Sequence, residues 1–486
     1  MQLSEYARFD ALGLAQLVAQ GEVSPRELAA TALAAIEALN PQLNAVVETY
    51  ADRIDGLDEA QLGAGPFRGV PCLIKDVFGH EAGRRIEFGS RLCRGMVAPQ
   101  DTHYAELLRA SGVNLLGRSN APEFSMAGTT ENALYGNTST PWRPGHSAGG
   151  STGGGAAAVA AGLVPIAHGS DIAGSIRIPA SWCGGVGLKP SRGRISFGPM
   201  LDENGYGLST NFVQTRSVRD TAAMLDCLAV PQPGDPFVIP RPALPYAQLA
   251  TQAPPRLRIA LTTAPLMGLP VDEGVAAAVR DTGALLAALG HHVEEATPQF
   301  DGLALLRQMM DIWFFGFDAR IALYASRTGR TPGPDTLEPA VLAIWEHACR
   351  ITPAQFQAAM AGLNTERRTL GRFIAPYDLW LTPTTTRTAE PWGRYNLGRA
   401  LPYEAIAETL YRPIAQFTLP HNVMGTPAIS LPLALHADGL PIGVQLGAHP
   451  AQEHLLLQVA AQLEAARPWA QRLPPLHASR LGTPAP

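Results

Sequence analysis

The chain has 486 residues, of which 46% are hydrophobic and only 16% are charged, and its formal net charge is -5. The apolar fraction excludes an intrinsically disordered protein, and the acidic balance argues against a nucleic-acid-binding surface as the main function. Because soluble domains usually carry about 25% charged residues, much of this chain must lie away from water.

The cysteines and the N-terminus point to a soluble protein of a reducing compartment. The five cysteines lack CxxC spacing, which is typical of reduced thiols and not of a disulfide framework. The first residues lack the basic and apolar regions of a signal peptide, so we expect a cytoplasmic protein. Residues 144–170 contain no Asp, Glu, Lys or Arg and are long enough to span a bilayer, but they are rich in Gly, Ser, Thr and Ala, so we expect buried interior and no membrane span.

The predicted elements begin with helices, and residues 1–65 are expected to form an N-terminal helical region. Ser24 to Glu27 match a capping box with Pro25 at the first helical position. The apolar spacing that follows predicts a helix that stops at Asn40-Pro41.

Strand-like and helix-like segments then alternate. The expected strands cover residues 70–74, 113–116 and 163–167, and the expected helices cover residues 101–110 and 153–162. This alternation predicts an α/β fold with a large mixed, twisted β-sheet that is covered by helices on both faces.

The second half continues this alternation after a Pro-rich stretch over residues 231–256, which is expected to be a linker or surface excursion. The predicted elements that follow are a strand at 257–261, a helix at 274–289, helical structure with exposed-looking aromatics at 308–350, a hairpin of strands 427–433 and 442–446, and a helix at 453–465. No repeat of fixed period is present. We expect one body with a single large sheet, that is, a single domain over residues 1–486.

The unusual composition concentrates in two segments rich in Gly and Ser, residues 147–155 and 169–180. Glycines beside a helix start allow backbone N–H groups to converge on a phosphate or on the oxyanion of acyl transfer. A phosphate-binding P-loop would need a Lys after the glycines, and none occurs between Lys75 and Lys189. A dinucleotide fingerprint would need a strand directly upstream, and the residues before Gly149 are not strand-like.

Two other interpretations of the glycines remain open at this point. Residues 149–153 satisfy the GxSxG pattern of a nucleophile elbow, for which His421 would be the obvious histidine, although the strand that should precede the elbow is missing. The glycines and serines could also be plain turns of a large α/β protein.

Lys75 is the candidate base, because apolar residues flank it on both sides: Leu73, Ile74, Val77 and Phe78. Desolvation in such a run lowers the pKa of a lysine and makes it a usable proton acceptor. The alternative is that Lys75 and Asp76 form a solvated turn. Two serines in glycine-rich segments and one such lysine supply a nucleophile, a relay and a base.

These segments resemble the amidase signature family, in which GGSSGG is followed by DxGGSIRxPA and preceded by a catalytic lysine. The resemblance covers almost the whole chain. The matching segments are 69–71 leading into Lys75-Asp76, 117–123, 130–132, 140–142, 183–190, 425–428 and 439–445.

The resemblance implies the amidase signature fold and a serine hydrolase that cleaves amide bonds through a Ser–cis-Ser–Lys triad. Ser175 matches the nucleophile, Ser151 the bridging serine with a cis peptide bond, and Lys75 the base. The amides of Ile172, Ala173, Gly174 and Ser175 match the oxyanion hole. The resemblance implies neither a cofactor nor a metal.

Three residues depart from the family pattern. Thr152 replaces the usual second serine but keeps a hydroxyl group. Gly155 stands where many members have serine. Ala173 replaces the first glycine of GGS, which puts the width of the acyl pocket in doubt but leaves the backbone N–H in place.

The residues around the substrate are expected in three places. The first is Ser125, Met126, Ala127 and Gly128, the second is the aromatic cluster with Trp313 and Phe317, and the third is His421-Asn422. The histidines at 103, 146, 291, 292 and 347 have no HExxH-like spacing, so no metal site is expected.

Within the family, the segments before His168 and around Glu453-His454 are similar to bacterial amidases that resemble 6-aminohexanoate cyclic dimer hydrolase. Aryl acylamidases and carbamate-cleaving urethanases are related members. The expected substrates are therefore small, largely apolar amides or carbamates, and esters in addition, and the protein is expected to be a monomer or homodimer. The alternatives are the glutamine-hydrolysing subunit of a tRNA amidotransferase and a non-catalytic binding protein on the same scaffold.

Overall fold

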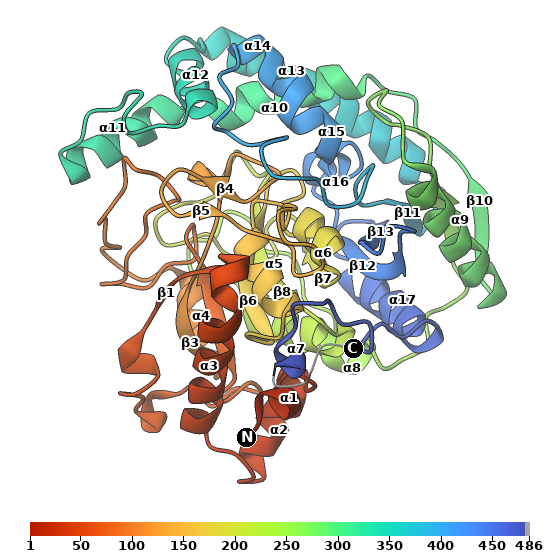
Figure 1. Cartoon of the computed structure of the whole chain (residues 1–486). Coiled ribbons are helices and arrows are strands. Elements are labelled where there is room, and N and C mark those ends of the chain that lie inside the picture. Colours follow the sequence, from red (N-terminus) through yellow and green to blue (C-terminus); the bar gives the residue numbers. More distant parts are fainter. Residues whose placement is uncertain (482–486) are drawn as a thin grey trace.

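The computed structural model describes residues 1–481 and contains one large and one small sheet within them (Figure 1). The strands are β1 (Val46–Thr49), β2 (Pro71–Lys75), β3 (Asn114–Ser119), β4 (Glu131–Asn132), β5 (Gly136–Asn137), β6 (Ile166–Asp171), β7 (Val186–Lys189), β8 (Thr210–Thr215), β9 (Arg258–Leu261), β10 (His292–Glu295), β11 (Leu379–Pro383), β12 (Ala428–Leu435) and β13 (Pro441–Ala448).

Helices separate most of these strands along the chain. The α-helices are α1 (Leu3–Tyr6), α2 (Ala11–Ala19), α3 (Pro25–Leu43), α4 (His103–Ala110), α5 (Gly153–Ala160), α6 (Arg177–Cys183), α7 (Val218–Leu228), α8 (Tyr246–Leu249), α9 (Glu273–Ala288), α10 (Gly302–Phe314), α11 (Phe317–Thr328), α12 (Pro339–Ala348), α13 (Pro353–Ile374), α14 (Tyr403–Ile406), α15 (Arg412–Ala415), α16 (Leu419–Met424) and α17 (Glu453–Ala466). Short 3-10 turns are η1 (Ala51–Arg53), η2 (Glu59–Gln61), η3 (Glu123–Ser125) and η5 (Ala478–Arg480), and η4 (Ala407–Tyr411) is a π-helical turn.

The large sheet has eleven strands in the order β1-β3-β2-β6-β8-β7-β12-β13-β11-β9-β10. Strands β3, β2 and β6 are parallel neighbours, as are β11, β9 and β10, and the remaining neighbours are antiparallel. The sheet is therefore mixed, and the prediction of a mixed sheet with helices on both faces is confirmed.

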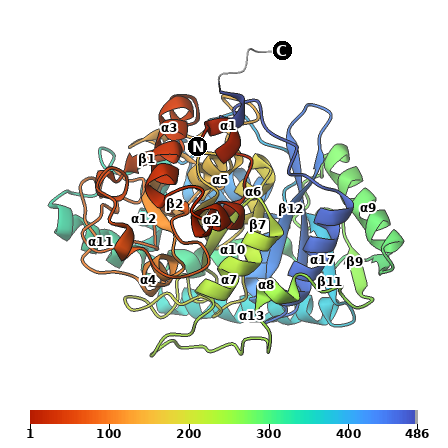
Figure 2. The same ribbon diagram turned by 90° about the horizontal axis from the view of Figure 1, so that it is seen from below.

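The hydrophobic interior of the described residues contains two large cores and one small cluster around Trp182, and side-chain alternation along β11 separates the two large cores. In β11, Leu379 and Leu381 belong to the core that contains α9 and α17, whereas Trp380 between them belongs to the core of α10 to α13. Successive residues of a strand point to opposite faces, so these two groups of helices cover opposite faces of the sheet. Figure 1 shows α10, α12 and α13 together along the top, and Figure 2 shows α7, α8 and α17 on the side facing the viewer.

The same alternation places α4 and α5 on opposite faces near β6. The ring of His168 lies 4.5 Å from that of Tyr104 in α4, measured between centroids. The preceding residue, Ala167, faces α5, where a Cβ on Gly155 would lie 3.1 Å from the Cβ of Ala167. A side chain at position 155 would therefore be in tight contact with Ala167.

The N-terminal region differs from the prediction in two respects. Helix α3 is capped by Ser24, as expected, but it runs through Pro41 and ends at Leu43, where Asn44 takes a left-handed conformation. Residues 46–49 form β1, an edge strand, so residues 1–65 are not helical throughout.

The strand expected at 163–167 begins later, at Ile166, because Gly162 and Leu163 form the C-terminal cap of α5. Gly162 has φ of 74°, its amide donates to the carbonyl of Val159, and the amide of Leu163 donates to that of Ala158. These bonds satisfy the last carbonyls of the helix in a Schellman-type cap.

The helical stretch expected at 308–350 is three helices, α10, α11 and α12. Gly316, with φ of 78°, separates α10 from α11. The aromatic residues were expected to be exposed, and this is wrong for Trp313, Phe314 and Phe317, which are buried in the second core.

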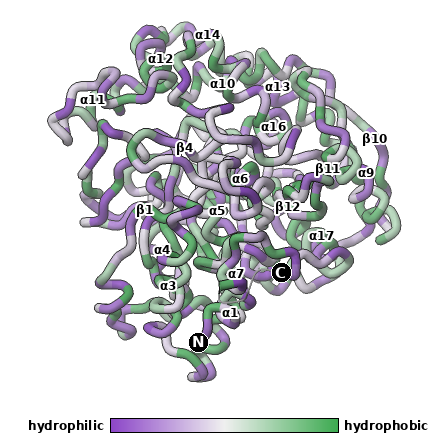
Figure 3. Tube along the Cα trace, viewed as in Figure 1, coloured by the Kyte–Doolittle hydropathy of each residue, from purple (hydrophilic) through white to green (hydrophobic). Residues whose placement is uncertain are grey.

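The other predicted elements correspond to β2, α4, β3, β9, α9, the hairpin of β12 and β13, and α17. The Pro-rich stretch 231–256 contains one short helix, α8, and its residues Phe237 and Val238 are exposed. Hydrophobic and hydrophilic residues alternate along outer helices such as α3 and α9 (Figure 3). Among residues 1–481, no helix is both long and apolar enough to cross a bilayer.

Candidate functional site

Lys75 is the last residue of β2, and three hydroxyl groups surround its side-chain nitrogen. Its Nζ lies 2.7 Å from Oγ of Ser151, 2.9 Å from Oγ of Ser170 and 3.1 Å from Oγ1 of Thr152. Lys75 is 2% exposed, and no carboxylate of the described residues lies within 4 Å of it. The charged form of Lys75 is therefore poorly compensated.

Burial lowers the pKa of Lys75 well below its usual value, and the negative charge of Asp171 opposes this shift only in part. A neutral amine has two N–H donors and one lone pair. Three hydroxyl neighbours match this inventory, because two of them can accept and the third can donate a proton to the nitrogen. The arrangement suits a lysine that removes a proton from a hydroxyl group.

Asp76 does not form a solvated turn with Lys75, so that alternative is wrong. Asp76 is buried, and its Oδ1 accepts from Nη1 of Arg118 at 2.6 Å. It also accepts from the amides of Glu87 and Gly89 at 2.7 and 2.9 Å. The ion pair of Asp76 with Arg118 of β3 thus holds the end of β2 in place, while the side chain of Lys75 contacts the hydroxyl groups.

Ser151 lies two residues before the start of α5, and the peptide bond between Gly150 and Ser151 is cis, as the resemblance implied. Ser151 is fully buried, and the next residue, Thr152, supplies the hydroxyl that the family's second serine would supply. The amide of Thr152 donates to the carbonyl of Ser175 at 3.2 Å. This bond ties the segment that carries Ser151 to the segment that carries Ser175.

The nucleophile-elbow interpretation of residues 149–153 finds no support. No strand directly precedes Gly149, and the hydroxyl of Ser151 contacts Lys75. His421 contacts Thr426 instead, with 2.9 Å between Nδ1 and Oγ1, and burial lowers the pKa of His421 well below its usual value.

Ser175 lies in the tight turn between β6 and α6, and the carboxylate of Asp171 holds this turn. Asp171 accepts from the amides of Gly174 and Ile176 at 2.8 and 3.2 Å. It also accepts two bonds of 2.9 Å from Nε and Nη2 of Arg177. Burial raises the pKa of Asp171, but the Arg177 guanidinium outweighs this effect, so the net shift is downward and the carboxylate stays charged.

Arg177 is fully buried, and its hydrogen bonds go to the protein interior. Besides Asp171, it donates to the carbonyl of Thr418, to Oε1 of Gln445 and to Oδ1 of Asn422. These contacts give Arg177 a structural role behind the turn that carries Ser175.

The amides after Asp171 differ from one another in a way that the sequence did not indicate. The Gly174 amide donates to Asp171, so it is not free for an oxyanion, and the expectation for this residue is corrected. The amides of Ile172, Ala173 and Ser175 have no hydrogen-bond acceptor among the described residues. Gly174 has φ of 130°, and a Cβ there would lie 2.5 Å from Oγ1 of Thr418, so glycine is needed at this position.

A narrow cavity opens beside Ser175. Its lining includes Ala173 and the following residues: Ser125, Ala127, Gly128, Ile172, Ile178, Trp313, Leu410, Tyr411, Ile414 and Ala415. The methyl group of Ala173 therefore occupies space in this cavity. None of the described residues that line it is charged.

Four residues that we expected around the substrate do not line this cavity. Met126 is buried, and its carbonyl accepts from the hydroxyl of Tyr411 at 2.7 Å. Phe317 packs edge-on against Phe124 in the second core. His421 packs near Trp380, and Asn422 donates to Asp171, so both belong to the support of the turn.

Sequence reasoning missed Ser170, whose hydroxyl contacts Lys75, and the wall contributed by residues 410–415. Ser170 lies within the second Gly/Ser segment, but nothing in the pattern separates it from the other serines. Residues 410–415 reach the cavity from the irregular helical region around η4 and α15, which has no clear periodicity.

Comparisons with known proteins agree on one family. The sequence profile described as "Amidase" matches residues 27–457. The chain is 41% identical to a 6-aminohexanoate-cyclic-dimer hydrolase of Pseudomonas sp. (strain NK87), with 96% of each chain covered. A solved structure of 6-aminohexanoate cyclic dimer hydrolase with substrate has a TM-score of 0.90 and 39% identity, and covers 97% of this chain and 99% of its own. The structure of a bacterial aryl acylamidase has a TM-score of 0.83 and 26% identity, and covers 98% of this chain and 99% of its own.

The contacts of Arg177 lead to a stability prediction. Arg177→Met leaves the buried carboxylate of Asp171 without its cation, and we expect the free energy of unfolding to fall by about 3–5 kcal/mol. Urea denaturation followed by circular dichroism measures this change. Arg350→Met is the matched control, because Arg350 is exposed. Equal stability of the two variants would show that Arg177 does not hold the turn.

Proposed function

Because the chain belongs to the amidase family and hydrolyses amide C–N bonds, we propose that it does so through an acyl-enzyme formed on Ser175. The observation that carries this proposal is the distance of 2.7 Å between Nζ of Lys75 and Oγ of Ser151. Lys75 is buried and has no carboxylate partner among residues 1–481. The bond from the Thr152 amide to the carbonyl of Ser175 keeps the two serine segments together, which supports the proposal that a proton passes from one hydroxyl to the next.

The first half of the reaction forms the acyl-enzyme. Neutral Lys75 takes the proton of Ser151, and Ser151 takes the proton of Ser175. The oxygen of Ser175 attacks the amide carbonyl and gives a tetrahedral intermediate with a negative oxygen. The proton then returns through Ser151 to the leaving amine, and the C–N bond breaks.

The second half repeats the relay with water, which attacks the acyl-enzyme and releases the carboxylic acid. In both halves the amides of Ile172, Ala173 and Ser175 donate to the negative oxygen, while Gly174 fixes the turn. A single such donor contributes about 3–4 kcal/mol to the stability of the transition state.

The proposed substrates are small amides with an apolar acyl chain or an aryl amine. The cavity beside Ser175 has no charged side chain among its described lining residues, and Ile178, Trp313 and Tyr411 give it an apolar wall. The similarity to a 6-aminohexanoate-cyclic-dimer hydrolase and to an aryl acylamidase supports the same class. Carbamates and esters are proposed as further substrates, because acyl transfer to Ser175 needs only a carbonyl group and a leaving group.

Two alternatives are disfavoured by particular observations. A glutamine-hydrolysing amidotransferase component would have to bind the charged α-amino and α-carboxyl groups of glutamine, and the lining of the cavity offers them no counter-charge. A non-catalytic binding protein would not need a buried lysine among three hydroxyl groups, since such burial costs free energy.

The assignment of the nucleophile is tested by Ser175→Ala. We expect kcat to fall by at least about a thousandfold, because no other group replaces the attacking oxygen. A phosphonyl fluoride should add its mass once to the wild-type chain and not to Ser175→Ala, as measured by intact mass spectrometry. Ser326→Ala, an exposed serine of α11, is the control. A Ser175→Ala variant that is labelled, or that keeps about a tenth of the wild-type kcat, would refute the assignment.

The lowered pKa of Lys75 gives a direction for the pH dependence. Because the base works only when deprotonated, kcat/KM should rise from acidic pH and reach a plateau at neutral to alkaline pH. Between about pH 5 and pH 9 the wild type should show this rise, and Lys75→Ala should be severely impaired throughout. A flat profile with chemistry as the rate-limiting step would contradict the role of Lys75.

The substrate class is tested by comparing kcat/KM for an aryl amide, an alkyl amide, a carbamate and an ester with kcat/KM for glutamine, without added proteins. We expect the aryl or alkyl amide to be the best substrate, because burial of an apolar group contributes about 1–3 kcal/mol. If glutamine is the best substrate, the amidotransferase alternative replaces this proposal.

A further inference from the structure

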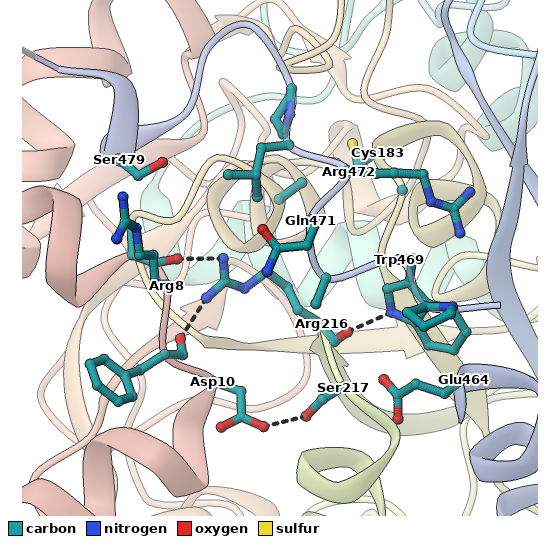
Figure 4. A pocket seen from close by; sticks show the side chains of 18 of the residues that line it. Arg8, Asp10, Cys183, Arg216, Ser217, Glu464, Trp469, Gln471, Arg472 and Ser479 are labelled. Carbon is teal, nitrogen blue, oxygen red and sulfur yellow. Dashed lines mark hydrogen bonds between the residues drawn. The ribbon is translucent and has the colours of Figure 1, made fainter. Parts of the chain in front are cut away.

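A second cavity, of about 780 Å³, lies apart from the candidate active site of Ser151 and Ser175 (Figure 4). It is enclosed by the N-terminal segment 7–10, by the segment 216–219 at the start of α7, and by the C-terminal segment 468–474. Its volume is within the range of small-molecule binding sites, about 300–1,000 Å³. It shares no lining residue with the cavity beside Ser175.

The second cavity lies at the C-terminal ends of α5, which follows Ser151, and of α6, which follows Ser175. Ala160, the last residue of α5, lines it, and so do Cys183 and Gly184 at the end of α6. Ser151 and Ser175 precede the opposite, N-terminal ends of the same helices. The carbonyl ends of α5 and α6 therefore point toward this cavity and give it a weak negative potential on that side.

Three arginines in the lining lack a carboxylate partner. No carboxylate of the described residues lies within 4 Å of the guanidinium groups of Arg8, Arg216 or Arg472. Arg216 donates to the carbonyls of Ala7 and Phe9 at 2.8 and 2.6 Å, which are neutral acceptors (Figure 4). Nη2 of Arg472 is buried and has no hydrogen-bond partner among the described residues.

The acidic groups nearby do not balance these charges. Asp10 already accepts two bonds of 2.5 Å from Arg219 and one of 2.9 Å from Ser217. Burial raises the pKa of Glu464 to about 7, so Glu464 is only partly charged at neutral pH. The cavity consequently carries net positive charge, and an unpaired buried guanidinium nitrogen is costly unless an acceptor reaches it.

The remaining wall is suited to an apolar body. The indole N–H of Trp142 donates to the carbonyl of Cys183 at 2.8 Å, and that of Trp469 donates to the carbonyl of Arg216 at 2.9 Å. Because both polar atoms are used, the rings present apolar surface to the cavity.

We propose that this cavity is a binding site for a small organic monocarboxylate with a planar apolar body. The carboxylate accepts from Arg472, and the ring lies against the tryptophans on the same side of the cavity as Arg472 (Figure 4). A single negative charge is favoured over a phosphate, because the carbonyl ends of α5 and α6 repel a multiply charged anion.

The experiment is isothermal titration of the full chain at low salt with benzoate as the probe. We expect one saturable site with Kd near about 1 mM, because a ligand of this size makes few contacts. Benzyl alcohol, which lacks the charge, and inorganic phosphate should each bind at least about tenfold more weakly. Absence of saturation up to about 20 mM benzoate, or tighter binding of phosphate, would overturn the proposal.

Single substitutions test whether benzoate binds in this second cavity. Arg472→Gln should weaken benzoate binding at least about tenfold, and Arg472→Lys, which keeps the positive charge, should weaken it less. Arg350→Gln, outside the cavity, and Ser175→Leu, which fills the cavity beside Ser175, should leave Kd unchanged. A Kd that rises in Ser175→Leu and not in Arg472→Gln would place benzoate in the candidate active site and refute this proposal. Because binding is measured without catalysis, the outcome is independent of the acyl-enzyme proposal.

Discussion

Burying an amine without an opposing carboxylate is costly, and the site around Lys75 is organised by that constraint. Lys75 has hydroxyl neighbours from Ser151, Thr152 and Ser170. The end of β2, the start of α5 and the end of β6 must all meet at one point to provide them. The adjacent carboxylate, Asp76, does not neutralise Lys75, because it pairs with Arg118. The environment therefore favours the neutral form of the lysine, which is the form that can accept a proton.

The buried carboxylate of Asp171, unlike the amine of Lys75, is paired with an opposite charge. Asp171 is kept ionised by Arg177, and its two oxygens fix the amides of Gly174 and Ile176. The turn that carries Ser175 is thus held by an ion pair, while the amine that would activate Ser175 is left without one. Because buried ion pairs are rigid when fully hydrogen-bonded, this division gives the turn a defined shape and leaves Lys75 free to exchange its proton.

The sequence predicted the parts of the site that depend on residue type and local spacing. Lys75 in an apolar run and the serines of two glycine-rich segments were found from such patterns, and the resemblance supplied the roles of Ser151 and Ser175 and their joint arrangement. The strand order, with β8 and β7 between β6 and β12, could not be predicted, because pairing of distant strands leaves no local signal.

Half of the residues that we expected around the substrate do not line the cavity beside Ser175, for a physical reason. His421 and Asn422 have polar side chains that are typical of a binding wall, but they are buried behind the turn, where Asn422 contacts Asp171. Phe317 is a core residue, whereas Tyr411 and Ile414 reach the cavity from an irregular segment. Which aromatic or aliphatic side chain faces a cavity depends on tertiary packing, and periodicity alone does not report it.

The neutral state of Lys75 at working pH can be measured directly, because Lys75 and Lys189 are the only two lysines of the sequence. After labelling lysine with ¹³C at Cε, the NMR shift of each can be followed against pH, and Lys189→Arg identifies the remaining signal as that of Lys75. We predict that Lys75 has a pKa well below the usual lysine value of about 10.4. A pKa of Lys75 at or above that value would contradict the proposed mechanism, because the amine would then be protonated wherever the enzyme works.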